Sequence, residues 1–141
     1  MIIDATDLIL GRLASFAAKK ALQGEKVDVV NCENAVLTGN KKQILAKYKQ
    51  RRDRGIPLKG PYYPRYPDRI VRRTIRGMLP WEKTTGREAF KRVMCYISVP
   101  ENFKEKKIET IEEANIEKVP NLRYIRMKDV CRFLGAKIKE Q

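Results

Sequence analysis

The chain has 141 residues, of which 43% are hydrophobic and 34% are charged, and its formal net charge is +14 at pH 7. This length and composition predict a single domain, residues 1–141, with a real core and a heavily charged surface. The charge favours a polyanionic partner, with nucleic acid first and an anionic membrane second. The chain has no histidine, which excludes Ser-His and Cys-His nucleophile pairs and any histidine metal site.

Signals for membranes, export and oxidation are weak. No apolar run approaches the ~18 residues of a spanning helix, and "MIIDATDLIL" lacks the basic leader of a secretory signal. Cys32, Cys95 and Cys131 lie far apart among apolar neighbours, without CxxC spacing. We therefore expect buried, reduced thiols that bind no metal, and a cytoplasmic location.

Charge is concentrated in the middle of the chain. Residues 41–92 carry 17 basic and 4 acidic side chains, whereas residues 1–40 carry 4 and 5, and residues 93–141 carry 10 and 8. A protein that is basic only for solubility has no reason to gather its charge in one third of its length. We interpret residues 41–92 as a basic insertion that faces the polyanion.

The first forty residues predict a β-α-β unit. "MIIDA" and "KVDVVNC" are apolar or β-branched enough for strands, and Gly24 is suited to end the helix between them. Two strands joined by a helix imply parallel pairing with a right-handed crossover. One apolar helix face recurs at spacings of three and four residues, at Leu10, Leu13, Ala14, Ala17 and Ala21.

The middle of the chain alternates regular and irregular segments. A short strand, "AVLT", precedes a helix that opens near Asn40 and ends near Asp53. Prolines and glycines exclude regular structure from Arg54 to Pro67. Asp68 is then expected to cap a helix that reaches Gly77.

The remaining residues predict two helices and two strands. "TTGREAFKRV" indicates a helix and "MCYISV" a buried strand that ends at Pro100. "RYIRMKDVCRFLGA" indicates a last strand and a short helix closed by Gly135. The polar residues 101–121, which carry both charge signs, indicate an excursion over the surface.

The Asp68–Gly77 helix has two chemically different sides. At 100° per residue, Val71, Thr74, Ile75 and Met78 lie opposite an arginine stripe with i, i+3, i+4, i+7 spacing: Arg69, Arg72, Arg73 and Arg76. One side is therefore suited to a core and the other to a row of phosphates, which the planar guanidinium fork binds with two hydrogen bonds. The alternative is a solvated cationic face, and the basic flanking loop favours phosphate.

Two further features bear on nucleic acid. The tyrosines Tyr62, Tyr63 and Tyr66 stand between basic residues and are suited either to stacking on unpaired bases or to packing on the domain. "TGNKK" places Lys41 and Lys42 at a helix N-terminus, where amides and the helix dipole attract phosphate, although many helices begin this way.

Enzyme motifs are missing. "DATDLILGRLAS" offers only Gly11 where a dinucleotide fold needs G-x-G-x-x-G, and there is no Walker sequence. Asp4 and Asp7 form a conceivable carboxylate pair, but a strand end and a turn explain both residues. We expect no catalysis and no small-molecule substrate.

Several stretches, in this order, resemble the family of the universal thirteenth protein of the large ribosomal subunit, in its archaeal and eukaryotic form. They are "DATDLILGRLAS" (4–15), "VVNCENAVLTGNK" (29–41), "PDRIVRRTIRGMLPWEKTTGREAFKRV" (67–93) and "LGA" (134–136). The most specific of these is "RGMLP" with Lys83, Gly86 and Arg87 after it. The resemblance covers most of the chain and fades across 101–121.

The resemblance implies an α/β protein with a three-layer α/β/α arrangement, a small, mostly parallel four-stranded sheet and basic loop and helix extensions. It also implies a structural role in binding large-subunit rRNA and in early subunit assembly, beside neighbouring ribosomal proteins, with no catalysis and no cofactor. The residues expected to contact rRNA are Lys41, Lys42, Lys49, Arg51, Arg52, Arg54, Lys59, Tyr62, Tyr63, Arg65, Arg69, Arg72, Arg73, Arg76, Lys83 and Arg87.

Two other classes of function remain open. A membrane-surface protein also uses cationic amphipathic helices, but Asp68–Gly77 is short and has no Trp or Phe on its apolar side. A sequence-specific DNA-binding protein favours Asn or Gln among the arginines of its recognition helix, and this helix has neither.

Overall fold

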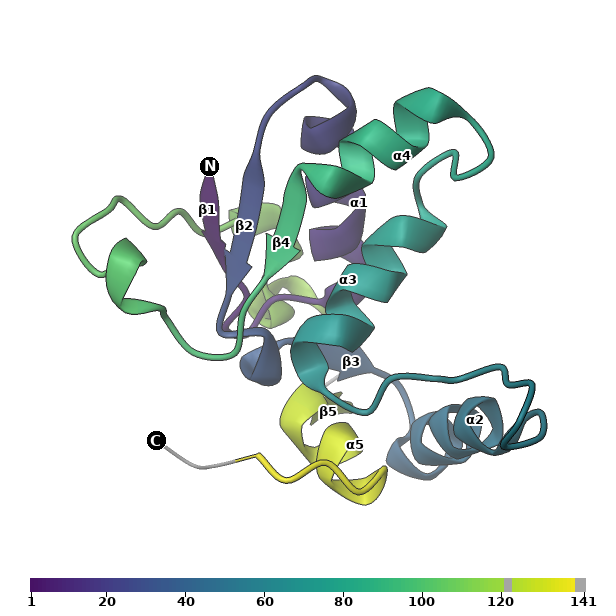
Figure 1. Cartoon of the computed structure of the whole chain (residues 1–141). Coiled ribbons are helices and arrows are strands. Elements are labelled where there is room, and N and C mark those ends of the chain that lie inside the picture. The colour runs from purple at the N-terminus through teal and green to yellow at the C-terminus, as the bar shows by residue number, and fades with distance from the viewer. Residues whose placement is uncertain (121–122, 139–141) are drawn as a thin grey trace.

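The computed structural model describes residues 1–120 and 123–138. Within these ranges the chain forms five α-helices and five β-strands (Figure 1). In chain order they are β1 (Ile2–Asp4), α1 (Leu10–Leu22), β2 (Val27–Val30), β3 (Val36–Thr38), α2 (Lys41–Asp53), α3 (Pro67–Gly77), α4 (Thr84–Lys91), β4 (Val93–Cys95), β5 (Tyr124–Arg126) and α5 (Met127–Phe133).

A parallel sheet with the order β1-β2-β4 forms the centre of the fold. All four residues of β2 are buried, as a central strand covered on both faces requires. Ile3, Val29 and Cys95 lie side by side in register across the three strands. The predicted β-α-β opening is confirmed, and so is the α/β class.

The remaining two strands form a separate sheet, in which β3 and β5 pair antiparallel. We expected four strands in one sheet, and the structure divides its five strands between two. Only residues 31–35 separate β2 from β3, and Asn31 has a positive φ of 55°. Such a connection is too short for a parallel crossover, so β3 pairs instead with a strand about 90 residues further along the chain.

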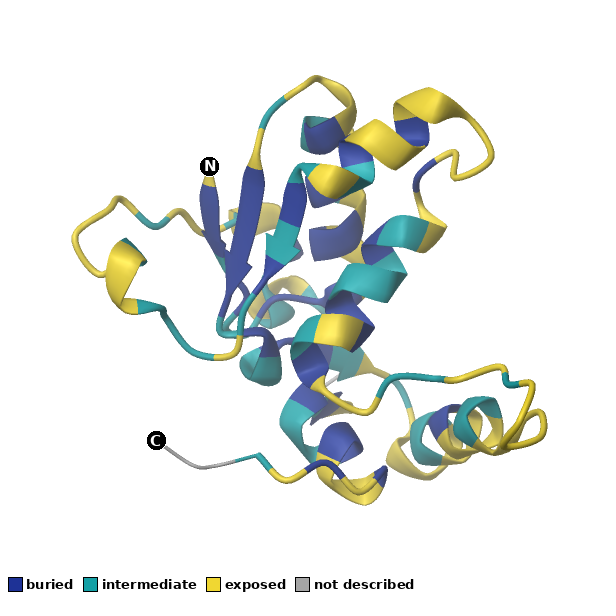
Figure 2. Cartoon of the chain, viewed as in Figure 1, coloured by how far each residue is buried: buried dark blue, intermediate teal, exposed yellow. Residues whose placement is uncertain are grey.

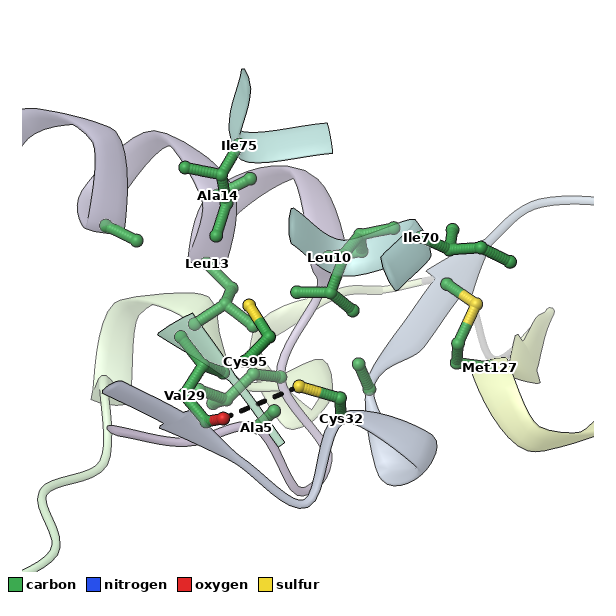
Figure 3. Close-up of a cluster of buried hydrophobic side chains, with 14 of the residues drawn as sticks. Ala5, Leu10, Leu13, Ala14, Val29, Cys32, Ile70, Ile75, Cys95 and Met127 are labelled. Atoms are coloured by element: carbon green, nitrogen blue, oxygen red, sulfur yellow. Dashed lines mark hydrogen bonds between the residues drawn. The ribbon is translucent and has the colours of Figure 1, made fainter. Parts of the chain in front are cut away.

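The helices α1, α3 and α4 pack against one face of the central sheet (Figure 2). Side chains from alternate strand positions and from these helices form a single buried cluster, which includes Leu13, Val29, Ile75 and Cys95 (Figure 3). On the opposite face Tyr96 packs edge-on against Phe103, with ring centroids 5.4 Å apart. Among the described residues, the second helical layer that we expected is replaced there by the loop after β4.

The helix α1 forms as its spacing predicts. Leu10, Leu13, Ala14, Ala17 and Ala21 are all buried, and each leucine contributes about 1.5–3 kcal/mol of burial free energy. The three alanines are small, which lets α3 and α4 approach α1 closely. Gly24 follows the helix with a φ of 95°, the left-handed conformation that a glycine adopts most easily.

Two local predictions need correction. Asp68 does not cap α3: Tyr66 is the N-cap residue and Pro67 is the first helical residue, so Asp68 lies inside the first turn. Proline has a φ preset for that position and no amide hydrogen to satisfy, so the helix begins two residues earlier than expected. The strand β4 ends at Cys95 and does not reach Pro100, because Ser98 adopts a positive φ of 56° and turns the chain.

Residues 101–120 run over the surface, as predicted, in short 3₁₀ turns and irregular segments. Residue 121, the last of the expected excursion, lies outside the described residues. Glu109 joins the edge of β1, where its amide donates to the Ile2 carbonyl oxygen at 2.9 Å and its carbonyl oxygen accepts from the Asp4 amide at 3.0 Å.

Candidate nucleic-acid interface

The helix α3 separates a buried side from an arginine side. Ile70, Val71 and Ile75 have no exposed surface, and they attach the helix to α1 and β4. Met78, which we expected on the buried side, is 41% exposed, and Ile70 fills the core in its place. The four arginines of the stripe are exposed or half-buried, so the predicted division into two sides is correct for the charged residues.

Three of the four arginines lie over aromatic rings. The guanidinium carbons of Arg72, Arg73 and Arg76 lie 4.4, 4.8 and 5.2 Å from the ring centroids of Phe90, Tyr63 and Trp81, respectively. Such cation–π contacts contribute about 0.5–1 kcal/mol each at exposed sites, and they restrict side chains that are otherwise mobile. The guanidinium groups are therefore held in a row before any ligand arrives.

Arg72 differs from the other three. Its Nε donates a hydrogen bond to the Val93 carbonyl oxygen at 3.0 Å, which ties α3 to the start of β4. Removing Arg72 would leave that carbonyl without this donor. Arg72 therefore has a structural role in the fold, and its contact with rRNA stays a prediction.

The helix α2 projects from the body beside the 54–66 loop (Figure 1). Tyr48 is its one buried residue, and Ile44 and Leu45 are half-buried. Arg52 is anchored, because its Nη1 donates to the Leu134 carbonyl oxygen at 2.9 Å and its Nε pairs with Asp53 at 3.2 Å. The rest of the helix surface is solvent-exposed and mostly basic.

The two ends of α2 offer separate sites. At the N-terminus the side chain of Asn40 accepts the Lys42 amide at 3.0 Å, so one amide of the expected phosphate site is already occupied. Lys41 and Lys42 remain exposed there. A helix rise of 1.5 Å per residue separates Lys41 from Arg51 by about 15 Å.

The 54–66 loop is held in a tight conformation by its own backbone. The Ile56 and Gly60 amides each donate to the other residue's carbonyl oxygen, at 3.2 and 2.8 Å, and the Tyr62 hydroxyl donates to the Pro57 carbonyl oxygen at 2.6 Å. A side chain at Gly55 would overlap the Gly60 carbonyl group. The loop therefore presents a preformed surface.

The tyrosines of this loop have different environments. Tyr62 is 69% exposed, and Tyr66 is also exposed. Tyr63 is half-buried, with its ring edge-on to Tyr48 at 6.1 Å. Tyr63 therefore packs on the domain, whereas Tyr62 and Tyr66 keep surface for a ligand.

The segment "RGMLPWEKTTG" forms a tight turn into α4. Gly86 packs so closely on Pro80 that a side chain would overlap the Pro80 carbonyl group. The Arg87 Nε donates to the Trp81 carbonyl oxygen at 3.1 Å. Lys83 and Arg87 are both exposed at this end of the molecule.

The sixteen predicted contact residues lie on α2, the 54–66 loop, α3, the turn at Trp81 and α4. Ten are exposed: Lys41, Lys42, Lys49, Arg54, Lys59, Tyr62, Arg65, Arg69, Lys83 and Arg87. Six are half-buried: Arg51, Arg52, Tyr63, Arg72, Arg73 and Arg76. Two recesses bring members together. One is lined by Arg51, Arg54, Tyr63 and Arg73, and the other by Arg69, Arg72, Arg73 and Arg76.

The charge of residues 41–92 is almost uncompensated. Among the residues that the structure describes, Arg52–Asp53 is the only ion pair formed within 41–92. An anion that lies along the surface would relieve the repulsion between like charges at i, i+3 and i, i+4 on α3.

Sequence reasoning missed the apolar residues that support this surface. Trp81 and Phe90 were not recognised, although they stand in a basic stretch where rings often stack on arginine. Their centroids lie 5.2 Å apart in an edge-on pair. Leu58, at the tip of the loop, is 91% exposed and was also missed.

Asp4 and Asp7 have structural partners. The Asp4 carboxylate accepts hydrogen bonds from the Thr6 amide at 2.9 Å, the Thr6 hydroxyl at 2.7 Å and the Asn31 side chain at 3.0 Å. The Asp7 carboxylate accepts from Arg126 at 3.1 Å. These bonds hold the turn between β1 and α1, as we expected of a strand end and a turn.

The three cysteines are buried free thiols, as predicted. The neighbouring Cys95 side chain and burial raise the pKa of Cys32 well above its usual value. Burial, with a smaller effect from Asp68, raises the pKa of Cys131 to about 12. In residues 1–120 and 123–138 no group of three or more Cys, Asp or Glu side chains is arranged to hold a metal ion, and no helix is long and apolar enough to cross a membrane.

The fold and this surface define a class: an α/β protein with a preformed cationic surface. A family model described as Ribosomal protein L13 matches residues 1–102. The chain therefore belongs to the ribosomal protein L13 family, which comprises structural, non-enzymatic components of the ribosome.

Individual relatives agree with this assignment, and the three described here are all called "Large ribosomal subunit protein uL13". The chain is 47% identical to the protein from Archaeoglobus fulgidus over 135 residues, which cover 95% of this chain and 86% of that protein. It is 46% identical to the protein from Methanopyrus kandleri over 136 residues, with the same coverage. It is 43% identical to the protein from Methanosarcina barkeri over 137 residues, which cover 96% of this chain and 98% of that protein.

Proposed function

We propose that this protein, a structural constituent of the large ribosomal subunit, binds large-subunit rRNA through the basic surface of residues 41–92 and supports early subunit assembly. Its proposed location is the ribosome in the cytoplasm, beside other large-subunit proteins. The observation that carries the proposal is the row of arginines on α3, which are fixed in position and are not neutralised by ion pairs among the described residues. Basic residues of α2 and the 54–66 loop precede this row in the chain, and those at the start of α4 follow it.

The proposed mechanism is neutralisation of phosphates at several places at once. A surface that spans α2, the 54–66 loop, α3 and the start of α4 can contact more than one rRNA segment. Charge neutralisation lets segments that otherwise repel each other pack together. Because the loop and the guanidinium groups are held in place before binding, little conformational entropy is lost on association.

Backbone and shape recognition fits this surface better than base reading in duplex DNA. The exposed side of α3 has arginines and no Asn or Gln, so it lacks the side chains that pair with adenine in the major groove. A membrane-surface role is less suitable, because the apolar side of α3 is already buried in the core.

The test is a binding comparison of the full chain with three polyanions at equal ionic strength: large-subunit rRNA fragments, duplex DNA and vesicles that contain anionic lipid. We expect selective binding to a subset of the rRNA fragments. Equal affinity for duplex DNA, or preferential binding to the vesicles, would contradict the proposal. Chemical footprinting on the whole rRNA then locates the contacts.

A further inference from the structure

A cavity of about 470 Å³ lies between the end of α2, the 54–66 loop and the end of α3. Its lining includes Arg51, Arg54, Pro61, Tyr63, Arg73 and Met78. We propose that this cavity binds a single unpaired nucleotide of the rRNA, with its phosphate on the three arginines. This inference rests on the proposed function and assigns one kind of RNA element to one site.

The charge of the cavity favours an anion. Three guanidinium groups line it, no carboxylate is among the lining residues, and none of the three has an ion pair within the described part of the chain. Arg51 and Arg73 are half-buried, so water screens their charges less than it screens those of the exposed lysines. A phosphate between the three forks would accept several charge-assisted hydrogen bonds.

The arginines are held at fixed positions around one ring. Arg51 and Arg73 both lie over Tyr63, at 6.0 and 4.8 Å from its centroid, and Arg51 also lies over Tyr48 at 5.6 Å. The Arg73 Nη1 also donates to the Tyr62 carbonyl oxygen at 3.4 Å. Because these two side chains are fixed by the protein, the site needs little reorganisation to take up a phosphate.

The remaining walls suit the rest of a nucleotide. Pro61 and Met78 offer apolar surface to a base or ribose, and Gly77 leaves the backbone at the end of α3 uncovered. The volume is within the roughly 300–1,000 Å³ of small-molecule sites. A base-paired nucleotide must be unpaired and unstacked before it enters such a recess, which costs free energy, whereas a bulged or loop nucleotide avoids most of this cost. Arg69 and Arg76, next to the cavity on α3, are placed for the flanking phosphates.

The experiment is 2′-hydroxyl acylation of whole large-subunit rRNA in the presence of the full chain. With the parent protein we expect an isolated, reactive nucleotide of the free rRNA to become protected within the wider footprint. In the double variant Arg51→Gln, Arg54→Gln that nucleotide should regain its reactivity while most of the footprint persists. The affinity of this variant should fall about tenfold more than that of a charge-matched control, Lys47→Gln, Lys91→Gln, which should keep the nucleotide protected.

A second variant tests whether loss of the protection could come from misfolding. Gly77→Leu keeps every charge and takes up part of the cavity, and no atom lies within 4 Å of the position that a Cβ would occupy at Gly77. It should expose the same nucleotide with an unchanged melting temperature. A footprint without any such nucleotide, or one that fades evenly in both variants, would overturn this inference alone. Absence of any footprint with the parent protein would overturn the proposed function as well.

A final experiment distinguishes binding of a nucleotide within rRNA from binding of a free mononucleotide. Equilibrium dialysis of the parent protein with each of the four free 5′-mononucleotides should detect only weak, millimolar binding that disappears in the Arg51→Gln, Arg54→Gln variant. Micromolar binding of a free mononucleotide, together with an rRNA footprint that ignores the cavity, would assign the site to a free nucleotide and overturn the RNA assignment.

Discussion

At the scale of single residues, the same side-chain type has different roles according to its neighbours. Arg69 projects into solvent, whereas Arg72 stacks on Phe90 and donates to a backbone carbonyl. Glycines differ in the same way. Gly11 in α1 has open space around it, and Gly86 in α4 is pressed against Pro80.

We expect opposite effects of alanine at these two glycines. Gly86→Ala should lower the free energy of unfolding by about 1–3 kcal/mol, because the new methyl group overlaps the Pro80 backbone. Gly11→Ala, the matched control, should raise it by about 0.4–1 kcal/mol, because it meets no atom and reduces the entropy of the unfolded chain. Urea denaturation of the two variants measures both values. Equal effects would show that α4 does not pack on Pro80 in this way.

The buried thiol of Cys131 predicts a pH dependence of stability. Its pKa rises to about 12 in the folded protein, while the unfolded thiol titrates near 8.5. The unfolded chain therefore loses this proton first, and stability should fall between about pH 9 and 12 by as much as about 1.4 kcal/mol per pH unit from this group. Urea denaturation at several pH values in this range gives the free energy of unfolding as a function of pH. This free energy should fall less steeply with pH for Cys131→Ala than for the parent. Identical slopes would mean that the thiol is exposed.

At the scale of elements, α3 connects the core to the ligand surface. Its buried side joins α1 and β4, and its arginine side is fixed by aromatic rings from the 54–66 loop, the Trp81 turn and α4. We therefore expect binding and folding to depend on different residues of this helix.

Variants of the two sides should separate these properties. Replacing Arg69, Arg73 and Arg76 with Gln should leave the free energy of unfolding within about 1–2 kcal/mol of the parent, because the loss of two cation–π contacts is offset in part by relief of repulsion. Binding to rRNA should nevertheless fall steeply.

Ile75→Ala, on the buried side of α3, should lower the free energy of unfolding by about 2–5 kcal/mol and leave the rRNA affinity of the folded molecules nearly unchanged.

Arg72→Gln provides the internal control for this helix. It should behave as a stability variant, with a loss of about 1–2 kcal/mol from the hydrogen bond to Val93 and the contact with Phe90. Thermal melting and filter binding on all three variants measure the outcomes. If the three-arginine variant binds rRNA like the parent, the arginine row is not part of the interface.

At the scale of the whole molecule, charge divides the fold into two halves. Residues 41–92 carry a net charge of +13, whereas the surface excursion of residues 101–118 carries six glutamates and four lysines. In Figure 1 the loop after β4 lies to the left of the central sheet, and α2 with its neighbouring loop lies to the right. An rRNA ligand should therefore approach from one side only.

The salt dependence of binding tests this polarity. If six to ten phosphates are neutralised, affinity should fall by about three to five decades between 50 and 200 mM salt, on the scale of duplex DNA. Replacing exposed basic residues of 41–92 with Gln should reduce both the affinity and the slope. Replacing the same number of exposed basic residues within 101–137 should change the affinity and the salt dependence only slightly. An equal loss of affinity from these replacements would contradict the assignment of binding to residues 41–92.

The sequence by itself determined the elements whose signals are local. The spacing of Leu10, Leu13 and Ala17 predicts α1, the β-branched run of Val27–Val30 predicts β2, and the arginine stripe follows from the 100° rotation per residue. These signals depend on neighbours within a few positions along the chain. The charge counts, which need no coordinates, also predict a polyanionic ligand.

Only the tertiary structure decided how distant segments meet. It paired β3 with β5, brought Val93 to Arg72, and placed Arg51 and Arg73 over the ring of Tyr63. Patterns of residues that are close in the sequence do not predict these contacts. The contacts arise because all segments compete for the same buried surface and the same hydrogen-bond partners. This is why the sequence predicts a row of arginines, while their aromatic supports, the anchoring role of Arg72 and the three-arginine cavity follow only from the fold.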